Sequence, residues 1–322
     1  MIEEILPDLF RIEIPMPKNP LKYLNSYVVK GEERNLIVDT GLNRKECHEA
    51  MLAGLEELGV DLNRTNFFIT HLHADHFGLV AKLVTEHSRI FFNRPDQEII
   101  ESRDGWDPMV DYAGLHGFPE DQLRAALEAH PGYRFHSDWI PTLSILNDDD
   151  VIEVGRYHFR CVMTPGHSRG HTCLYEPDKK VLLAGDHILI DITPNIQCWS
   201  DAENPLQNYL DSLDKVSHLD VDLVLPGHRR LVTDFQGRIQ ELKTHHRTRA
   251  DEILVILRQG PRNAYQVASE MTWDINVKSW EEFPVSQKWF ATGEAIAHLR
   301  YLEEGSEIGR QQNGNLVTFL LN

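Results

Sequence analysis

A short apolar run, NFFIT (66–70), leads directly into HLHADH, which begins at His71 and places three histidines and an aspartate within six residues. In a hydrophobic core, so many polar side chains without partners would cost on the order of several kcal/mol. In an extended segment His71 and His73 project to the same side, so both can bind one ion. Asp75 and His76 follow and can reach a second ion. The segment therefore predicts a metal site directly after a buried strand.

Three later segments have the same form, an apolar run followed by a break and a polar side chain: MTPGH, LLAGDH and VLPGH. A Pro-Gly or Ala-Gly break ends a strand and places the next side chain at the rim of a sheet. His167, Asp186 and His228 occupy this position. With Asp186 as a bridge, the set suffices for two divalent ions: His71, His73 and His167 for the first, and Asp75, His76 and His228 for the second. Imidazole with carboxylate suits zinc first, with iron and manganese as alternatives.

The first 230 residues otherwise have the pattern of an α/β domain. LFRIEIP (9–15) alternates apolar and polar residues, as a half-buried strand does. Residues 25–41 and 172–187 each have the form of a hairpin with a charged turn, and the second strand ends at Asp39 or Asp186. These two similar halves predict an internal pseudo-repeat and two packed sheets. Helices are predicted over 44–58, 77–87 and 204–218.

Two regions depart from this pattern. Residues 94–142 mix Pro, Gly and aromatic residues with one helix-forming segment, EDQLRAALEAH, and predict a helical insertion over the end of the sheet. After about 240, a long helix over 236–258 is followed by NAYQVASEM, by a second long apolar helix and by a hairpin on an Asn-Gly turn. Three helices and a two-stranded wing are the winged-helix pattern. We therefore predict a catalytic domain over 1–240 and a small winged-helix-like domain over 241–322.

The composition of the chain limits where the protein is expected in the cell and what it is expected to bind. The 322 residues include 32 Lys/Arg and 50 Asp/Glu, a net charge of −18, which argues against nucleic acid or an anionic membrane as a partner. The chain has no apolar run of about 18 residues and starts with the acidic MIEEILPDLF, so we expect no membrane span and a cytoplasmic protein. The four cysteines have no C-x-x-C spacing, so they predict buried thiols without disulfides.

In order along the chain, HLHADH, TPGH, AGDH and LPGH resemble the metallo-β-lactamase fold superfamily over about residues 8–230. IVDTG resembles the first motif of this superfamily. The predicted ligand set, which includes Asp75, resembles that of its glyoxalase II, lactonase and RNase Z-type branch. The tail and ITPNI (192–196) resemble the β-lactamase-like protein 2 type, which carries a C-terminal winged helix. The resemblance implies a four-layer αββα sandwich with a dinuclear site at one edge. It also implies that Asp39 supports the ligands from behind, and that His171 and His187 are not ligands.

The resemblance also implies a chemistry. Two ions about 3.5–4 Å apart lower the pKa of a bridging water towards neutrality and polarise a carbonyl or phosphoryl oxygen, while Asp75 orients the hydroxide. The expected activity is hydrolysis of a small ester, thioester or lactone by a metal-bound hydroxide. A metal-dependent endoribonuclease or phosphodiesterase is the alternative, since relatives with this tail include RNA-cleaving enzymes. A non-catalytic metal-binding interaction protein is the second alternative.

Substrate and partner residues are less marked in the sequence. Tyr112 and His116, in the predicted insertion, are the candidates for lining a substrate cleft. In the tail, acidic residues outnumber basic ones, and the helix that would read DNA offers only Lys288 and Arg300. This favours a packing role or a homodimer contact over nucleic-acid binding, which the sequence leaves open. We expect a small molecule as the substrate.

Overall fold

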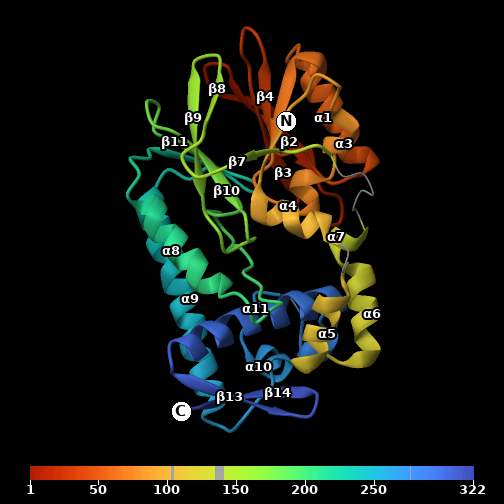
Figure 1. Cartoon of the computed structure of the whole chain (residues 1–322), viewed down its shortest axis with the longest axis vertical. Helices are drawn as coiled ribbons and strands as arrows, with labels where there is room; N and C mark the ends of the chain where they lie inside the picture. Colours follow the sequence, from red (N-terminus) through yellow and green to blue (C-terminus); the bar gives the residue numbers. More distant parts are fainter. Residues whose placement is uncertain (103–104, 135–140, 276) are drawn as a thin grey trace. The chain divides into compact units, whose positions relative to one another are not determined.

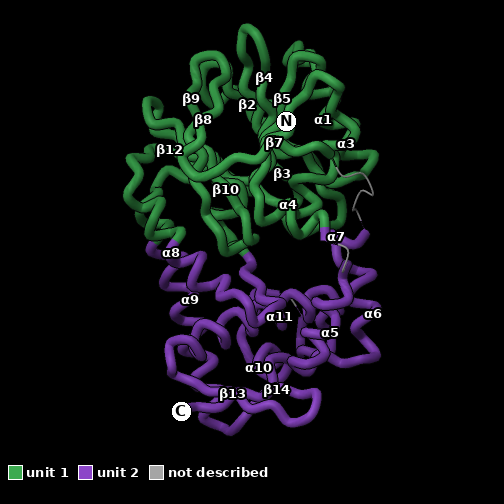
Figure 2. Tube along the Cα trace, in the orientation of Figure 1, with its two compact units in different colours: residues 1–101, 135–194, 212–239 green, residues 102–134, 195–211, 240–322 purple. Residues whose placement is uncertain are grey.

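The structure is a computed structural model that describes residues 1–102, 105–134, 141–275 and 277–322. The predicted insertion over 94–142 therefore includes residues 103–104 and 135–140, which lie outside the described part. The chain divides into two compact units (Figure 2). Unit 1 comprises residues 1–101, 135–194 and 212–239, and unit 2 comprises residues 102–134, 195–211 and 240–322.

Unit 1 contains two sheets (Figure 1). In the first, the strands lie in sequence order, and the neighbours from β4 to β7 run parallel: β1 (Ile2–Leu6), β2 (Leu9–Pro15), β3 (Tyr23–Val29), β4 (Asn35–Val38), β5 (Thr65–Phe68), β6 (Ile90–Asn93) and β7 (Ser144–Leu146). The second has the order β12-β11-β10-β9-β8, from β8 (Val151–Val154), β9 (Tyr157–Met163), β10 (Thr172–Glu176), β11 (Val181–Gly185) and β12 (Leu223–Pro226). This confirms the two predicted sheets.

Two hydrophobic clusters hold these layers together. One lies between the sheets, where Tyr27, Val38 and Phe68 of the first pack with Phe159 and Leu183 of the second. The other lies on the outer face of the first sheet, which is covered by α1 (Lys45–Glu57) and α3 (Val80–Leu83) (Figure 1). Burial of each large side chain contributes roughly 1.5–3 kcal/mol to folding. The strand alternation in the sequence therefore serves two cores, one on each face.

The helix predicted over 77–87 is shorter than expected. The structure has two single turns instead, α2 (Ala74–Phe77) and α3. Between them the Leu79 N–H donates to the carbonyl of Gly41, 2.9 Å away. A Cβ at Gly78 would lie 2.7 Å from the backbone nitrogen of Asn43. Close packing against the loop after β4 therefore interrupts the helix. The remaining helices of this region are α4 (Arg94–Glu101) and the 3₁₀ turn Leu62–Arg64.

Unit 2 is mainly helical. Its core joins α5 (Asp107–Leu115) and α6 (Glu120–Ala129) to α11 (Val285–Glu304), with Trp289 stacked on Trp199 at 4.4 Å between ring centroids. The helices of the predicted insertion thus pack with the C-terminal region within unit 2, which also takes in residues 195–211. The division into domains over 1–240 and 241–322 stays a prediction. The other elements are α7 (Pro131–Arg134), α10 (Ala264–Glu270), the 3₁₀ turn Trp280–Glu282, β13 (Ile308–Asn313) and β14 (Leu316–Leu321). Two helices, α8 (Pro205–Ser217) and α9 (Phe235–Leu257), contribute residues to both units.

The C-terminal elements follow the predicted order, three helices and then a hairpin whose Gly314 has φ of 62°. That these elements form a winged-helix-like domain stays a prediction. The structure gives α11 little basic surface, because Lys288 is buried and Arg300 pairs with Glu303 and Glu304, each at 2.8 Å. This burial favours a packing role for the helix.

Two further expectations can be compared with the structure. All four cysteines are buried and free, as predicted. Within the described residues, we find no helix with the length and apolar character that crossing a bilayer requires.

Candidate metal centre

The predicted site residues converge at one edge of unit 1. Parallel strands end at the same edge of a sheet, which is where ligands bind in open α/β folds. Asp39 directly follows β4, and Thr70 and His71 follow β5. In the second sheet, Asp186 directly follows β11 and His228 follows β12. Apolar strands thus deliver polar side chains from distant parts of the chain to one place.

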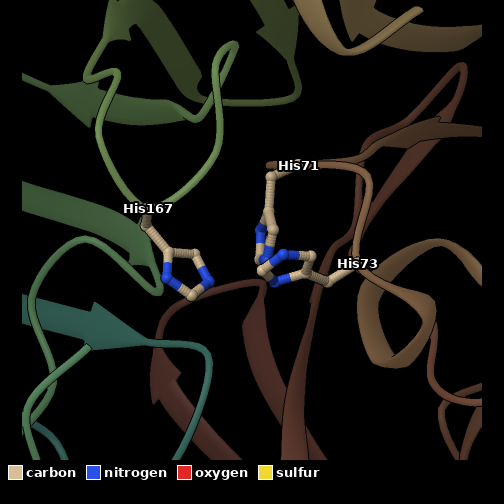
Figure 3. A group of neighbouring side chains, drawn as sticks. All are labelled: His71, His73 and His167. Atoms are coloured by element: carbon tan, nitrogen blue, oxygen red, sulfur yellow. The ribbon is translucent and has the colours of Figure 1, made fainter. Parts of the chain in front are cut away.

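Three histidines form the first group. The rings of His71, His73 and His167 have centroids 4.5–4.8 Å apart. Figure 3 shows the three imidazoles turned toward one another, His71 and His73 from the segment after β5 and His167 from the loop before β10. Their ligand atoms all lie within 4.8 Å of one another, so this group is able to hold a metal ion.

Asp75, His76 and His228 form the second group with the same spacing. The Nε2 atom of His228 lies 3.3 Å from Oδ2 of Asp75. Asp186 lies between the groups: its carboxylate oxygens are 3.6 Å from Nε2 of His167 and 3.5 Å from Nε2 of His76. The structure therefore brings together all seven residues predicted as ligands, with Asp186 in contact with both groups.

Hydrogen bonds on the outer ring atoms turn these imidazoles inward. Nδ1 of His76 lies 2.7 Å from Oδ2 of Asp39, and Nδ1 of His228 donates to the carbonyl of Tyr23 at 2.8 Å. Nδ1 of His71 lies 2.9 Å from the Thr70 hydroxyl, which itself donates to Asp39. Partners of this kind fix the tautomer and leave the Nε2 lone pair available to a cation.

The unpaired atoms of the cluster fit a cation. The Nε2 atoms of His71, His76 and His228, and Oδ1 of Asp186, are buried without a hydrogen-bond partner among the residues that the structure describes. A buried polar atom without a partner costs about 1–3 kcal/mol, so such atoms rarely gather without a reason. These atoms carry lone pairs and face one another. A divalent cation satisfies them together, which is why we regard the cluster as a metal centre.

Charge and burial set the protonation of the cluster. Burial, and then the neighbouring His167, lowers the pKa of His73 to about 3, so this side chain is neutral at pH 7 and free to ligate. Burial opposes the charged form of His76, but the carboxylates of Asp39 and Asp186 outweigh it and raise its pKa. Binding of a cation at His76 therefore competes with its protonation.

Asp39 lies behind the cluster, as the resemblance implied. Its carboxylate is buried and accepts hydrogen bonds from both the backbone N–H and the hydroxyl of Thr70, each at 2.9 Å. It also contacts Nδ1 of His76. Its backbone is left-handed, with φ of 58°, a conformation that costs on the order of 1 kcal/mol for a residue other than glycine. This strain is consistent with a fixed role in the site.

Two supporting residues were not singled out from the sequence as such. Thr70 links Asp39 to His71, and its only sequence signal is its place directly before HLHADH. His171 accepts the backbone N–H of Asp186 at Nε2, 3.1 Å away, and bonds the Thr164 hydroxyl through Nδ1. Both ring nitrogens of His171 are thus engaged by the protein. That His171 is not a ligand stays a prediction.

The two substrate candidates lie in unit 2. The Tyr112 hydroxyl donates to Asp201 at 2.9 Å, and His116 is completely buried, with Nδ1 3.1 Å from the carbonyl of Tyr112. Both side chains thus form hydrogen bonds within unit 2. Their contact with a substrate stays a prediction.

Gly227, directly before His228, has no room for a side chain. A Cβ there would lie 2.6 Å from Oδ1 of Asp186 and 2.8 Å from Cε1 of His76. We expect Gly227→Ala to push these side chains apart and weaken metal affinity by about tenfold or more, measured by chelator competition. Gly114→Ala is the control, since its Cβ would make an ordinary contact with Leu123 at 3.8 Å and should leave metal affinity unchanged. Equal affinity of the two variants would contradict the expectation.

Comparisons with known proteins agree with this geometry. The family model described as "Metallo-beta-lactamase superfamily" matches residues 21–228, a range that includes all seven residues of the cluster. The "Probable metallo-hydrolase YqjP" of Bacillus subtilis (strain 168) is 27% identical over 322 residues, 97% of this chain and 97% of its own. The human "Acyl-coenzyme A thioesterase MBLAC2" is 28% identical over 217 residues, 63% of this chain and 72% of its own.

A solved structure extends the likeness to the whole chain. The metallo-beta-lactamase family protein TTHA1429 from Thermus thermophilus superposes with a TM-score of 0.83 and 27% identity, covering 99% of this chain and 100% of that one. The predicted metallo-β-lactamase fold is thereby confirmed. The chain belongs to the metallo-beta-lactamase superfamily, as a metal-dependent hydrolase.

Proposed function

We propose that this protein is a dinuclear metal hydrolase that cleaves a small ester, thioester or lactone, with an acyl thioester as the first candidate. The position of Asp186 carries the proposal, because its two carboxylate oxygens lie within 3.6 Å of histidines from both groups. A carboxylate between two sets of ligands is suited to hold two neighbouring cations. The thioesterase name of the human relative supports the choice of a thioester.

The seven residues divide into two sets of ligands. His71, His73 and His167 would hold one ion, Asp75, His76 and His228 would hold the other, and Asp186 would reach both. When bound, such ions make hydroxide available at neutral pH and polarise a carbonyl oxygen. We propose zinc first, with iron and manganese as alternatives.

The chain's own groups then orient the reaction. The Asp75 carboxylate would accept a hydrogen bond from the attacking water and hold it toward the acyl carbon. Attack forms the carbon–oxygen bond, the bond from the carbonyl carbon to sulfur or oxygen breaks, and the leaving group takes up a proton. Behind the ligands, Asp39, Thr70 and the Tyr23 carbonyl keep the imidazoles in place.

A panel of substrates tests the proposal. Purified, metal-replete protein should hydrolyse an acyl-coenzyme A thioester, an aryl ester or a lactone, and His73→Ala should reduce that rate by at least about 100-fold. His87→Ala is the matched control, because the His87 side chain is 59% exposed and lies beside Glu86, away from the cluster. Cleavage of single-stranded RNA without cleavage of any ester would instead support the endoribonuclease alternative. Two bound ions without any hydrolysis would support the non-catalytic alternative.

A further inference from the structure

Asp96, at the start of α4, is a fully buried carboxylate that is neither a predicted ligand nor a contact of one. It accepts hydrogen bonds from the Leu72 N–H at 3.0 Å, the Ser168 hydroxyl at 2.8 Å and the Gly170 N–H at 2.8 Å. The Asn93 side-chain amide lies at 3.5 Å. Buried carboxylates with this many donors hold their surroundings in one arrangement, because losing one acceptor leaves buried donors without partners.

The donors belong to two loops that are far apart in sequence. Leu72 lies between His71 and His73, and Ser168 directly follows His167. The single carboxylate of Asp96 therefore joins the two segments that supply all three histidines of the first group.

The second group is held by other contacts. His76 is bonded to Asp39, and His228 to the carbonyl of Tyr23. Among the described residues, no hydrogen bond of Asp96 extends to Asp75, His76 or His228. Asp96 thus holds the segments of the three-histidine group, whereas Asp39 and the Tyr23 carbonyl hold the histidines of the second group.

The loop after His167 is closely fitted to this carboxylate. The Asn93 side chain accepts the backbone N–H of Asp96 at 2.8 Å, and it leaves no space for a side chain at Gly170. Gly170 can therefore bring its N–H to Asp96 only because it lacks a Cβ. Helix α4, β6 and the loop after His167 are thus joined through Asp96.

We propose that Asp96 is a positioning residue that sets the distance between His167 and the His71–His73 pair, and thereby the affinity of the three-histidine group for its cation. This inference rests on the proposed metal-binding function. Preorganised ligands bind a metal more tightly than loops that must be ordered on binding, and loss of such support costs about 10–100-fold in metal affinity.

The test separates the two groups with two background variants. In His228→Ala only the three-histidine group stays complete, and in His167→Ala only the other group does. Each metal-free protein, with and without Asp96→Asn, is titrated with Zn²⁺ against a chelator of known affinity. We expect Asp96→Asn to weaken binding about 10–100-fold in the His228→Ala background and less than about threefold in the His167→Ala background. Equal weakening in both backgrounds, or none in either, would overturn the inference.

Controls distinguish positioning from general destabilisation. Glu176→Gln changes another fully buried carboxylate of unit 1, which accepts the backbone N–H groups of His158 and Asp178 away from the cluster. It should lower the melting temperature with unchanged Zn²⁺ affinity. Should Asp96→Asn fail to fold, Ser168→Ala removes one donor only and should weaken the three-histidine group about three- to tenfold. Wild-type protein that binds no cation would instead overturn the proposed function itself.

Discussion

Removal of bound cations with a chelator should abolish hydrolysis and lower the free energy of unfolding by about 4 kcal/mol for each occupied site, if the cation had been present at a thousand times its dissociation constant. The physical reason is the cluster itself. Without cations, buried lone pairs of His71 and His228 have no partner among the described residues, and the carboxylates of Asp75 and Asp186 lie close together. Chemical denaturation with and without chelator measures the loss.

Metal content gives the stoichiometry. Elemental analysis of the replete protein should find near two ions per chain, and return of the cation should restore both activity and stability. The cation that restores the highest rate distinguishes zinc from iron and manganese. A chelated protein that keeps its activity, or a replete protein with one ion, would contradict the dinuclear site.

Much of this centre could be predicted from the sequence because its ligands follow a local rule. Each comes shortly after an apolar strand, directly in HLHADH and after a short break in cases such as VLPGH before His228. Parallel strands then end together at one edge. Local patterns of this kind survive folding because burial of the apolar strand fixes where the next polar residue emerges.

The supporting contacts follow no such rule. Asp96 bonds Leu72 and Gly170, which are 24 and 74 residues away, and only the packing of α4 beside both loops brings them together. The Tyr23 carbonyl that orients His228 is a backbone group, which every residue has, so the sequence cannot indicate its role. The helix predicted over 77–87 ended early for the same reason, since the contact of Leu79 with Gly41 depends on tertiary packing. Long-range hydrogen bonds of this type set the positions of the ligands, and they cannot be predicted from local sequence patterns.

Substitution of Asp75 by asparagine should reduce kcat for the preferred ester or thioester by about 10²–10⁴-fold. Asparagine keeps the size of the side chain but lacks the negative charge that holds and orients the attacking water. His71, His73 and His167 are unchanged in this variant, so we expect at least one ion to stay bound. Asp191→Asn is the control, because Asp191 is an acidic residue of the same unit that pairs with Arg230 at 2.9 Å on the surface. Its kcat should stay within about twofold of the wild-type value.

The pH profile separates Asp75 from the other titrating groups. Burial would raise the pKa of Asp75, but the nearby His228, 3.3 Å away, and His76 outweigh burial and hold that pKa below its usual value. A lowered pKa keeps the carboxylate ionised above its ordinary pKa of about 4, so activity that falls between pH 7 and 5 reflects protonation of histidine ligands or of the attacking water. Asp75→Asn should therefore lower the plateau of kcat. Because the Asp75 carboxylate raises the pKa of His228, the variant should also move the midpoint of the acid limb to lower pH without removing the limb. An acid limb that disappears with Asp75→Asn would show that this carboxylate itself titrates in that range, and would refute its assignment as a permanently charged acceptor.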